Sequence, residues 1–428
     1  MKPRKLAFEL LQKLEKNDQF SNIMLDKALA DSDMSAEDKA LASLLLYGVT
    51  ERRLTLDYQI SLLSSRPLSE LDLGVRTALR LGLYQLIYTD RIPPHAAINE
   101  TVELCPKKVS GFVNAILRAY TRSKGVRYPE PSEGFCEYLS VRYSVGLALA
   151  EKLTEAYGEE RAERILSGFE RIPETTLAVN TLKISREELA EHISDARPTE
   201  LSHSGLRVKG SVRELYGYGD GLFFVQDEAS QLCVKALGAK EGETVLDICA
   251  CPGSKSFGAA ISMKNNGRVL SFDLHAKKLP LIVSGAQRLG INIISASGCD
   301  GRRFLPELEA KADRVLCDVP CSGFGVLSKK PELRYKDPKT SEALPDIQLA
   351  ILENACRYVK SGSTLVYSTC TIFPEENEEN IRRFLERHPE FSLAPCTADG
   401  LDIPDGYITL MPDTHPTDGF FIAKLRKK

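Results

Sequence analysis

The sequence of 428 residues lacks any run of about 20 consecutive apolar residues, the length that a membrane-spanning helix requires. It also lacks the apolar core and small-residue cleavage site of a signal peptide. Its basic start is followed instead by leucines at helical spacing, including Leu6, Leu10 and Leu14. The membrane-protein class is therefore excluded, and we expect a cytoplasmic protein with no membrane partner.

Zinc-binding and disulfide patterns are missing as well. The 11 cysteines include no Cys-x-x-Cys pair. The closest groupings, Cys249 with Cys251 and Cys317 with Cys321, do not have good zinc spacing. An odd number of cysteines without a secretion signal argues against a disulfide framework. We expect no metal and mostly reduced core cysteines, so a reactive cysteine has to be identified from its local context.

Positive charge is not in excess either, because 56 Lys and Arg face 59 Asp and Glu, which gives a net charge of −3. The overall charge therefore gives no sign of nucleic-acid binding. Basic residues do cluster locally. We predict that Arg118, Arg122 and Lys124 contact phosphates, because they lie beside the joint between two predicted domains.

What is present is a pattern that changes twice along the chain. Residues 1–125 have apolar residues at helical spacing, with most Gly and Pro at segment ends, and predict a helical bundle. Residues 126–220 begin with a Pro/Gly-rich joint and predict a small α+β domain. In residues 221–428 strands and helices alternate, which is typical of a parallel sheet with helices on both faces.

The predicted elements define where a ligand should bind. In the second part we expect strands over 175–180 and 206–208, with a helix over 186–193. In the third part we expect strands over 244–248, 268–273, 292–295, 314–318 and 363–368, helices over 254–263, 277–289, 301–308 and 344–359, and an antiparallel pair over 407–411 and 419–425. Ligands of parallel sheets bind at the carboxyl ends of the strands, so the residues after each strand are candidates.

Acidic residues stand at or after the ends of three successive predicted strands. Asp247 is followed by a loop of small residues and a helix, whose first N–H groups can bind a carboxylate. Asp273 lies where an acidic side chain can hold a ribose diol, and Asp300 where one can accept from an adenine amine. Any one of them alone would indicate a helix cap or a turn. Together they predict a ligand that contains adenosine.

Two cysteines follow the next two strands. Cys321 lies in the segment Asp318–Gly323, and Cys370 lies in the segment Tyr367–Thr371. Both should face one cleft, in which helix N-termini and a lysine favour the reactive thiolate. The alternative is that both are buried structural cysteines, but the flanking Pro, Ser, Gly and Thr residues argue against it.

These residue types suit methylation of cytosine at carbon 5, which is a poor nucleophile. Attack of a thiolate at carbon 6 turns the ring into an enamine, and carbon 5 can then take a methyl group. The adduct must afterwards lose its carbon-5 proton and eliminate the thiol. A carboxyl group at the N3/N4 edge of the base stabilises the charge that develops during attack. Cys370, Asp318 and Cys321 supply the thiol, the carboxyl group and a second group for release.

The motifs Asp-x-Cys-Ala-x-Pro-Gly-x-Lys, Asp-x-Pro-Cys-Ser-Gly and Ser-Thr-Cys together resemble the Nop/Sun superfamily of RNA cytosine-C5 methyltransferases. The resemblance implies that Cys370 is the nucleophile, that Cys321 assists release and that Asp318 contacts the cytosine. We place Lys255 with these catalytic residues. The residues that the resemblance assigns to the methyl donor, S-adenosyl-L-methionine, are Cys249, Ala250, Cys251, Pro252, Gly253, Ser254, Lys255, Asp273, Asp300 and Asp318. Cys251 and Ser254 replace the usual Ala and Gly.

Residues 93–100 and 112–118 resemble the NusB helical RNA-binding fold. NusB-like helices joined to a Sun-type catalytic domain are similar to the bacterial RsmB (Sun) branch of the superfamily. The resemblance implies a multidomain fold. Its expected parts are an all-α NusB-like bundle (1–125), a small α+β linker domain (126–220) and a Rossmann-like class I S-adenosylmethionine-dependent methyltransferase domain (221–428).

The same resemblance implies a substrate. This is cytosine 967 of 16S ribosomal RNA, either in naked RNA or in a small-subunit assembly intermediate. We also expect the enzyme to be a monomer. Residues 331–335 resemble a substrate-side loop of the superfamily, with Tyr335 where Trp is more usual.

Three alternatives remain open at this point. The first is a NusB-like RNA-binding or assembly factor with an inactive methyltransferase domain. The second is a C5 methyltransferase that acts on a different rRNA or tRNA cytosine. A DNA cytosine-C5 methyltransferase is the third, and it would use Cys321 rather than Cys370 as the nucleophile. The intact Ser-Thr-Cys motif and the NusB-like segment argue against this last alternative.

Overall fold

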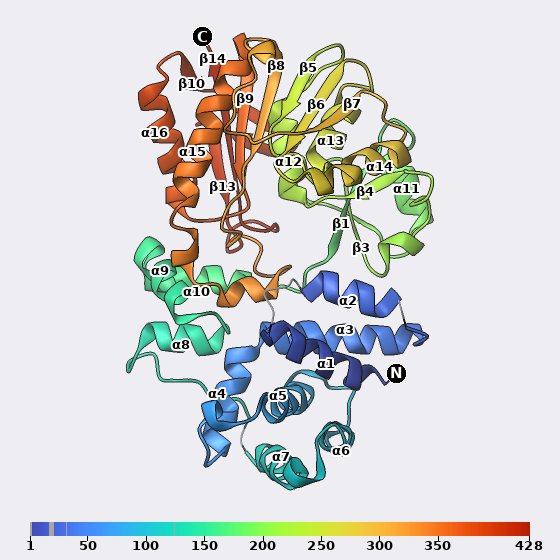
Figure 1. Cartoon of the computed structure of the whole chain (residues 1–428), viewed down its shortest axis with the longest axis vertical. Coiled ribbons are helices and arrows are strands. Elements are labelled where there is room, and N and C mark those ends of the chain that lie inside the picture. The colour runs from blue at the N-terminus through green and yellow to red at the C-terminus, as the bar shows by residue number, and fades with distance from the viewer. Residues whose placement is uncertain (1, 17–20, 31, 124) are drawn as a thin grey trace. The chain divides into compact units, whose positions relative to one another are not determined.

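The computed structural model describes residues 2–16, 21–30, 32–123 and 125–428 (Figure 1). They form two compact units, residues 1–170 with 329–338 and residues 171–328 with 339–428. Lys124, one of the predicted phosphate contacts, lies outside the described residues. No helix in the described part of the chain combines the length and the apolar character that a membrane crossing requires. The division into three domains at residues 125 and 220 stays a prediction.

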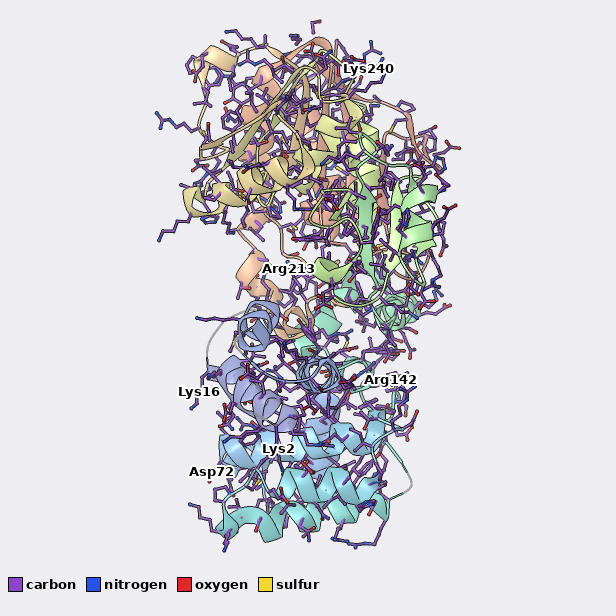
Figure 2. The ribbon with its side chains drawn as sticks, turned by 90° about the vertical axis from the view of Figure 1, so that its right-hand side faces the viewer. Lys2, Lys16, Asp72, Arg142, Arg213 and Lys240 are labelled. Carbon is purple, nitrogen blue, oxygen red and sulfur yellow. The ribbon has the colours of Figure 1, made fainter. Side chains whose placement is uncertain are left out.

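The first unit is built from helices. They are α1 (Pro3–Lys16), α2 (Ser21–Ala30), α3 (Ala36–Glu51), α4 (Arg53–Leu63), α5 (Leu73–Tyr88), α6 (Pro94–Val102), α7 (Lys107–Thr121), α8 (Phe135–Arg142), α9 (Leu147–Tyr157) and α10 (Glu159–Gly168). Leu79 and Leu83 of α5 are fully buried, and α5 packs against α1, α3, α4, α6 and α7. Of the charged residues that Figure 2 labels on this unit, Lys2, Lys16 and Asp72 are exposed and Arg142 is half-buried. The predicted helical bundle is confirmed.

Close packing of α5 explains a glycine inside this helix. A Cβ atom at position 82 would lie 2.6 Å from Leu117 Cδ1 and 3.2 Å from Thr101 Cγ2. Gly82 costs the helix about 1 kcal/mol relative to alanine. A side chain there would instead force α5 away from α6 and α7, so the glycine lets these helices pack closely.

The segment Lys329–Pro338 belongs to the first unit, although the second unit contains the residues on either side of it. Its Arg334 is completely buried there. The guanidinium donates to the carbonyl oxygens of Tyr143 at 2.8 Å and Phe169 at 3.1 Å, and it lies 3.5 Å from a carboxylate oxygen of Glu51. The segment predicted to be a substrate-side loop therefore contains a buried residue, Arg334, that holds it to the helical unit.

We predict that Arg334→Met lowers the free energy of unfolding by about 3–5 kcal/mol, because it removes the guanidinium that donates to two carbonyl groups and leaves Glu51 with Arg52 alone. Urea denaturation followed by circular dichroism measures the change. Arg91→Met is the matched control, since Arg91 is exposed in the same unit and its loss should have little effect. Equal stability of the two variants would contradict the anchoring role.

The smaller sheet of the second unit is antiparallel, in the order β2-β3-β1-β4. Its elements are β1 (Thr175–Val179), α11 (Arg186–His192), β2 (Arg197–Pro198), β3 (Gly205–Val208) and β4 (Phe223–Val225). Leu177, Leu206 and Phe223 form its core with Leu189 of α11. The predicted α+β arrangement, with a helix between two short strands, is confirmed.

The larger sheet has the order β10-β14-β9-β8-β5-β6-β7, with β13 beside β14. Its strands are β5 (Thr244–Asp247), β6 (Arg268–Asp273), β7 (Ile294–Gly298), β8 (Ala312–Asp318), β9 (Val359–Thr369), β10 (Phe391–Leu393), β13 (Tyr407–Leu410) and β14 (Phe420–Lys427). Strands β5 to β9 pair in parallel, whereas β10 and β13 pair antiparallel with β14, as predicted for the C-terminal pair. A separate antiparallel pair consists of β11 (Cys396–Ala398) and β12 (Leu401–Ile403).

Helices cover both faces of this sheet (Figure 1). They are α12 (Glu228–Leu237), α13 (Ser254–Ser262), α14 (Leu279–Leu289), α15 (Leu344–Ala355) and α16 (Glu378–Arg387). Because side chains alternate along a strand, Val245 packs into one core with α12 to α14, and Leu246 packs into the other with α15 and α16. The chain returns from β7 to β8 beside β5, and such a reversal of strand order is where ligands of these sheets bind.

One predicted element is wrong. The helix expected over 301–308 is a turn and an irregular stretch that ends in the short 3-10 helix Pro306–Leu308. Two local causes account for it. Pro306 disfavours a helical conformation at Leu305, and the Asp300 carboxylate accepts the Arg302 N–H at 3.0 Å in a local turn.

Candidate active site

The candidate donor loop joins β5 to α13. Gly253 has a φ of 111°, and a Cβ atom there would lie 2.7 Å from the Phe257 ring, so this position requires glycine. The loop is fixed by Asp273 at the end of β6. Its carboxylate accepts the Cys251 N–H at 3.0 Å and the His275 N–H at 2.8 Å. The predicted loop and Asp273 therefore lie together, and the start of α13 faces the same edge of the sheet.

Asp247 is one of the three acidic strand ends that the sequence indicated, although it is not among the residues that the resemblance assigns to the methyl donor. It is only 1% exposed, and one carboxylate oxygen accepts from Ser256 at 2.6 Å, while the other oxygen, Oδ1, has no hydrogen-bond partner. Burial and the nearby Asp318 carboxylate raise the pKa of Asp247 to about 7. A buried carboxylate oxygen without a partner in the protein is a position to which a bound ligand can donate a hydrogen bond.

Asp300 lies just beyond β7, where the sequence placed it. Its carboxylate forms a fork with the guanidinium of Arg302, with a shortest distance of 2.7 Å. The pair is partly exposed, so it contributes little to stability and can open toward a ligand. Its predicted contact with adenine stays a prediction.

Lys255 and Asp318 form a close ion pair at the centre of the site. The Lys255 ammonium donates to Asp318 Oδ2 at 2.6 Å, and the Ser368 hydroxyl donates to Oδ1 at 2.7 Å. Burial opposes the charge on Lys255, but the Asp318 carboxylate outweighs it and holds the pKa of the ammonium above its usual value. The structure therefore brings Lys255 of the donor loop to Asp318, beside the motif that contains Cys370.

The two candidate cysteines are in direct contact. The Cys321 and Cys370 sulfur atoms lie 3.1 Å apart, and the Cys370 N–H donates to the Cys321 sulfur at 3.3 Å. The hydrogen bond with Cys370, burial and the Glu376 carboxylate all hold the pKa of Cys321 well above its usual value. Cys321 therefore holds its proton more firmly than a free thiol does, and it can donate this proton toward the Cys370 sulfur.

Glu376 ties the Cys321 loop in place, and sequence reasoning missed it. This carboxylate is 2% exposed and accepts the Ser322 N–H at 2.9 Å and the Gln348 amide at 2.8 Å. Gln348 also donates to the Pro320 carbonyl at 2.9 Å. The only signal in the sequence is a run of charged residues after Pro374, and such a run usually indicates a solvated surface.

Three family profiles match the sequence of this chain. They are "16S rRNA methyltransferase RsmB/F" over residues 234–426, "NusB family" over 1–122 and "Methyltr_RsmF/B-like, ferredoxin-like domain" over 148–213. A Bacillus subtilis protein named "Probable ribosomal RNA small subunit methyltransferase B" is 38% identical, over 99% of this chain and 98% of its own length. The chain belongs to the RsmB/F family of 16S rRNA methyltransferases. The predicted NusB-like, α+β and methyltransferase parts are thereby confirmed.

Solved structures agree with this fold. One named PH0851 is 28% identical, has a TM-score of 0.82 and is matched over 100% of this chain and 99% of its own. A methyltransferase homologue from Pyrococcus horikoshii is 29% identical, with a TM-score of 0.59, over 70% of this chain and 100% of its own. The similarity to PH0851 therefore extends beyond the catalytic sheet to the whole family architecture.

We predict that Glu376→Gln lowers the pKa of Cys321, because it removes a negative charge that disfavours the thiolate. The measurement is the pH dependence of alkylation of Cys321 by iodoacetamide, made in a Cys370→Ala background so that a single site thiol is followed. The midpoint should move to lower pH. Glu379→Gln, which changes an exposed carboxylate nearby, is the control and should leave the midpoint unchanged. A shift to higher pH would contradict the electrostatic role of Glu376.

Proposed function

We propose that this protein transfers a methyl group from S-adenosyl-L-methionine to carbon 5 of a cytosine in 16S ribosomal RNA, with Cys370 as the covalent nucleophile. The observation that supports it most is the 3.1 Å contact between Cys370 and Cys321, with the Lys255–Asp318 pair beside it. The family and the name of the Bacillus subtilis relative favour small-subunit ribosomal RNA as the substrate. Cytosine 967 is the proposed target.

The donor would be held by the loop Cys249–Lys255 and by the acidic residues at the strand ends. The unpartnered Oδ1 of Asp247 fits its ammonium group, and the first N–H groups of α13 fit its carboxylate. Asp273 is proposed for the ribose and Asp300 for the adenine. When bound, the donor supplies the electrophilic methyl group, and the residues of this chain position it.

Attack begins at Cys370. Its thiolate forms a bond to carbon 6 of the cytosine, and the displaced electrons move toward N3 of the ring. Asp318 lies 2.6 Å from the Lys255 ammonium, so its carboxylate can accept from the N4 amine of the base while the ammonium stays charged beside it. This positive charge stabilises the negative charge that develops on the ring during attack, and carbon 5 becomes nucleophilic.

Release requires a base, and the contact between the sulfurs explains how Cys321 becomes one. Before attack, the hydrogen bond with Cys370 is the largest influence that raises the pKa of Cys321. Once Cys370 is bonded to carbon 6, that sulfur no longer accepts a proton, so Cys321 loses its proton to solvent more readily. The Cys321 thiolate then takes the carbon-5 proton, and the Cys370–carbon bond breaks to return the thiolate and the methylated base.

We predict that Cys370→Ala abolishes methylation of unmodified 16S RNA, whereas Cys321→Ala accumulates a covalent protein–RNA complex because the adduct cannot be resolved. Bisulfite sequencing measures the methylation, and a denaturing gel measures the complex. Cys105→Ala, in the helical unit, is the control and should match the wild type. An active Cys370→Ala enzyme would refute the assignment of Cys370 as the nucleophile. Methylation rates measured with naked RNA and with an immature small subunit would identify the preferred substrate.

Donor binding should depend on pH through Asp247. The carboxylate is charged above its pKa of about 7 and protonated below it, so affinity for the donor ammonium should fall as the pH falls through about 7. Isothermal titration with S-adenosylmethionine at several pH values measures this dependence. Asp247→Asn should bind more weakly and lose the dependence near this pH. A wild-type affinity that stays constant across this range would argue against a charged contact from Asp247.

A further inference from the structure

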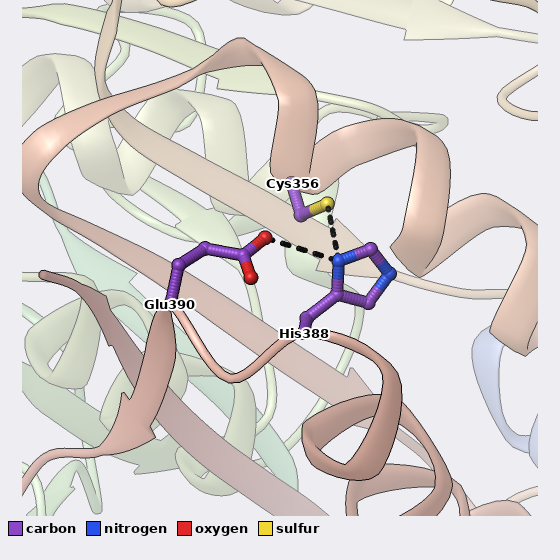
Figure 3. Close-up of side chains that lie close together, drawn as sticks. All are labelled: Cys356, His388 and Glu390. Carbon is purple, nitrogen blue, oxygen red and sulfur yellow. Dashed lines mark hydrogen bonds and ion pairs between the residues drawn. The ribbon is translucent and has the colours of Figure 1, made fainter.

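A second cluster of reactive side chains lies in the catalytic unit, away from the strand ends described above. Figure 3 shows Cys356, which directly follows α15, with His388 and Glu390 from the connection between α16 and β10. Cys356 lies just before β9, an eleven-residue strand that starts at Val359 and ends at Thr369, next to Cys370. The cluster is therefore at the opposite end of this strand from the candidate active site.

The three side chains lie close enough together to become ligands of one small cation. His388 Nδ1 lies 3.8 Å from the Cys356 sulfur and 3.1 Å from a Glu390 carboxylate oxygen, and all three atoms lie within 4.8 Å of one another. Bonds of about 2.0–2.3 Å in a tetrahedral zinc site place such atoms about 3.3–3.6 Å apart. Among the described residues, no other group of His, Cys, Asp and Glu meets this condition.

The surroundings hold these groups in position. Cys356 is 3% exposed, and its sulfur lies 3.1 Å from the Glu353 carbonyl at the C-terminus of α15, where the helix dipole favours a cation. The His388 ring stacks on Phe384 at 4.6 Å, which directs Nδ1 to the other two groups. His388 and Glu390 remain 23% and 45% exposed, so a water molecule can complete the coordination.

We propose that Cys356, His388 and Glu390 bind a zinc ion that joins α15, α16 and β10. Sulfur, imidazole nitrogen and carboxylate oxygen are the donor set that zinc accepts, and a thiolate with a carboxylate balances its two charges. The Lys427 ammonium lies 3.5 Å from the Cys356 carbonyl and limits the affinity. Our expectation of no metal rested on the absence of cysteine pairs with zinc spacing, whereas these ligands are brought together from distant parts of the sequence. The site is independent of the proposed methyl transfer.

The test uses full-length protein stripped with a chelator and then titrated with Co²⁺, which occupies zinc sites and shows a charge-transfer absorption when bound to a thiolate. One equivalent should produce this absorption in the wild type, and Zn²⁺ should displace it and raise the Tm. Cys356→Ala should lose the absorption. His388→Ala, a change at a partly exposed position, should weaken Zn²⁺ binding at least about tenfold in a competition assay.

The catalytic cysteines require their own control, because two thiols in contact can also bind a metal. The double variant Cys321→Ala/Cys370→Ala should keep the Co²⁺ absorption and the Tm increase. Loss of the signal in this variant but not in Cys356→Ala would overturn the proposal and place the metal at the other cysteines. Absence of the absorption in the wild type, or equal Zn²⁺ affinity in His388→Ala, would overturn it as well and leave a hydrogen-bonded cluster only.

Discussion

The parallel pairing of β8 with β9 is the constraint on which the candidate active site depends. Its register places Asp318 opposite Ser368, so the loops that follow the two strands leave the sheet at the same edge. Cys321 comes three residues after Asp318 and Cys370 two residues after Ser368, and their sulfur atoms meet at 3.1 Å. A shift of the register by one residue would reverse the faces of the side chains and separate this set.

Burial makes the charge states of the site residues depend on one another. Lys255, Glu376 and Asp247 are buried and Asp318 is half-buried, so the charge on each of these groups depends strongly on its neighbours. Lys255 compensates Asp318, and backbone and amide groups compensate Glu376. Asp247 keeps an oxygen without a partner, which leaves this side of the site ready for a positive ligand.

The strand ends could be predicted from the sequence because they depend on local patterns. Asp247, Asp273 and Asp318 each follow a short apolar run, and the topology of a parallel sheet brings such ends together. Glu376 could not be found this way, because nothing local distinguishes it from Glu379, which is exposed. Its inward position follows from the loop that packs it against Ser322 and Gln348, residues far away in the sequence.

The same limit applies to two other features. Arg334 looked like part of a substrate-side loop, but long-range packing makes it a buried anchor of the helical unit. Cys356 and His388 are 32 positions apart in the sequence and meet only because α15 and α16 pack side by side. The incorrectly predicted helix over 301–308 is different, since its cause is local: Pro306 disfavours a helical conformation at Leu305 despite the helical pattern of the apolar residues.

The most direct test of the account is to identify the sulfur that bonds to the base. RNA that contains 5-fluorocytidine at the target position keeps its carbon-5 substituent, so the adduct cannot be resolved and can be digested and mapped by mass spectrometry. The proposed mechanism predicts a single modified peptide, in which the nucleotide is attached to Cys370. Attachment to Cys321, or methylation of normal RNA without any adduct on the fluorinated RNA, would contradict it.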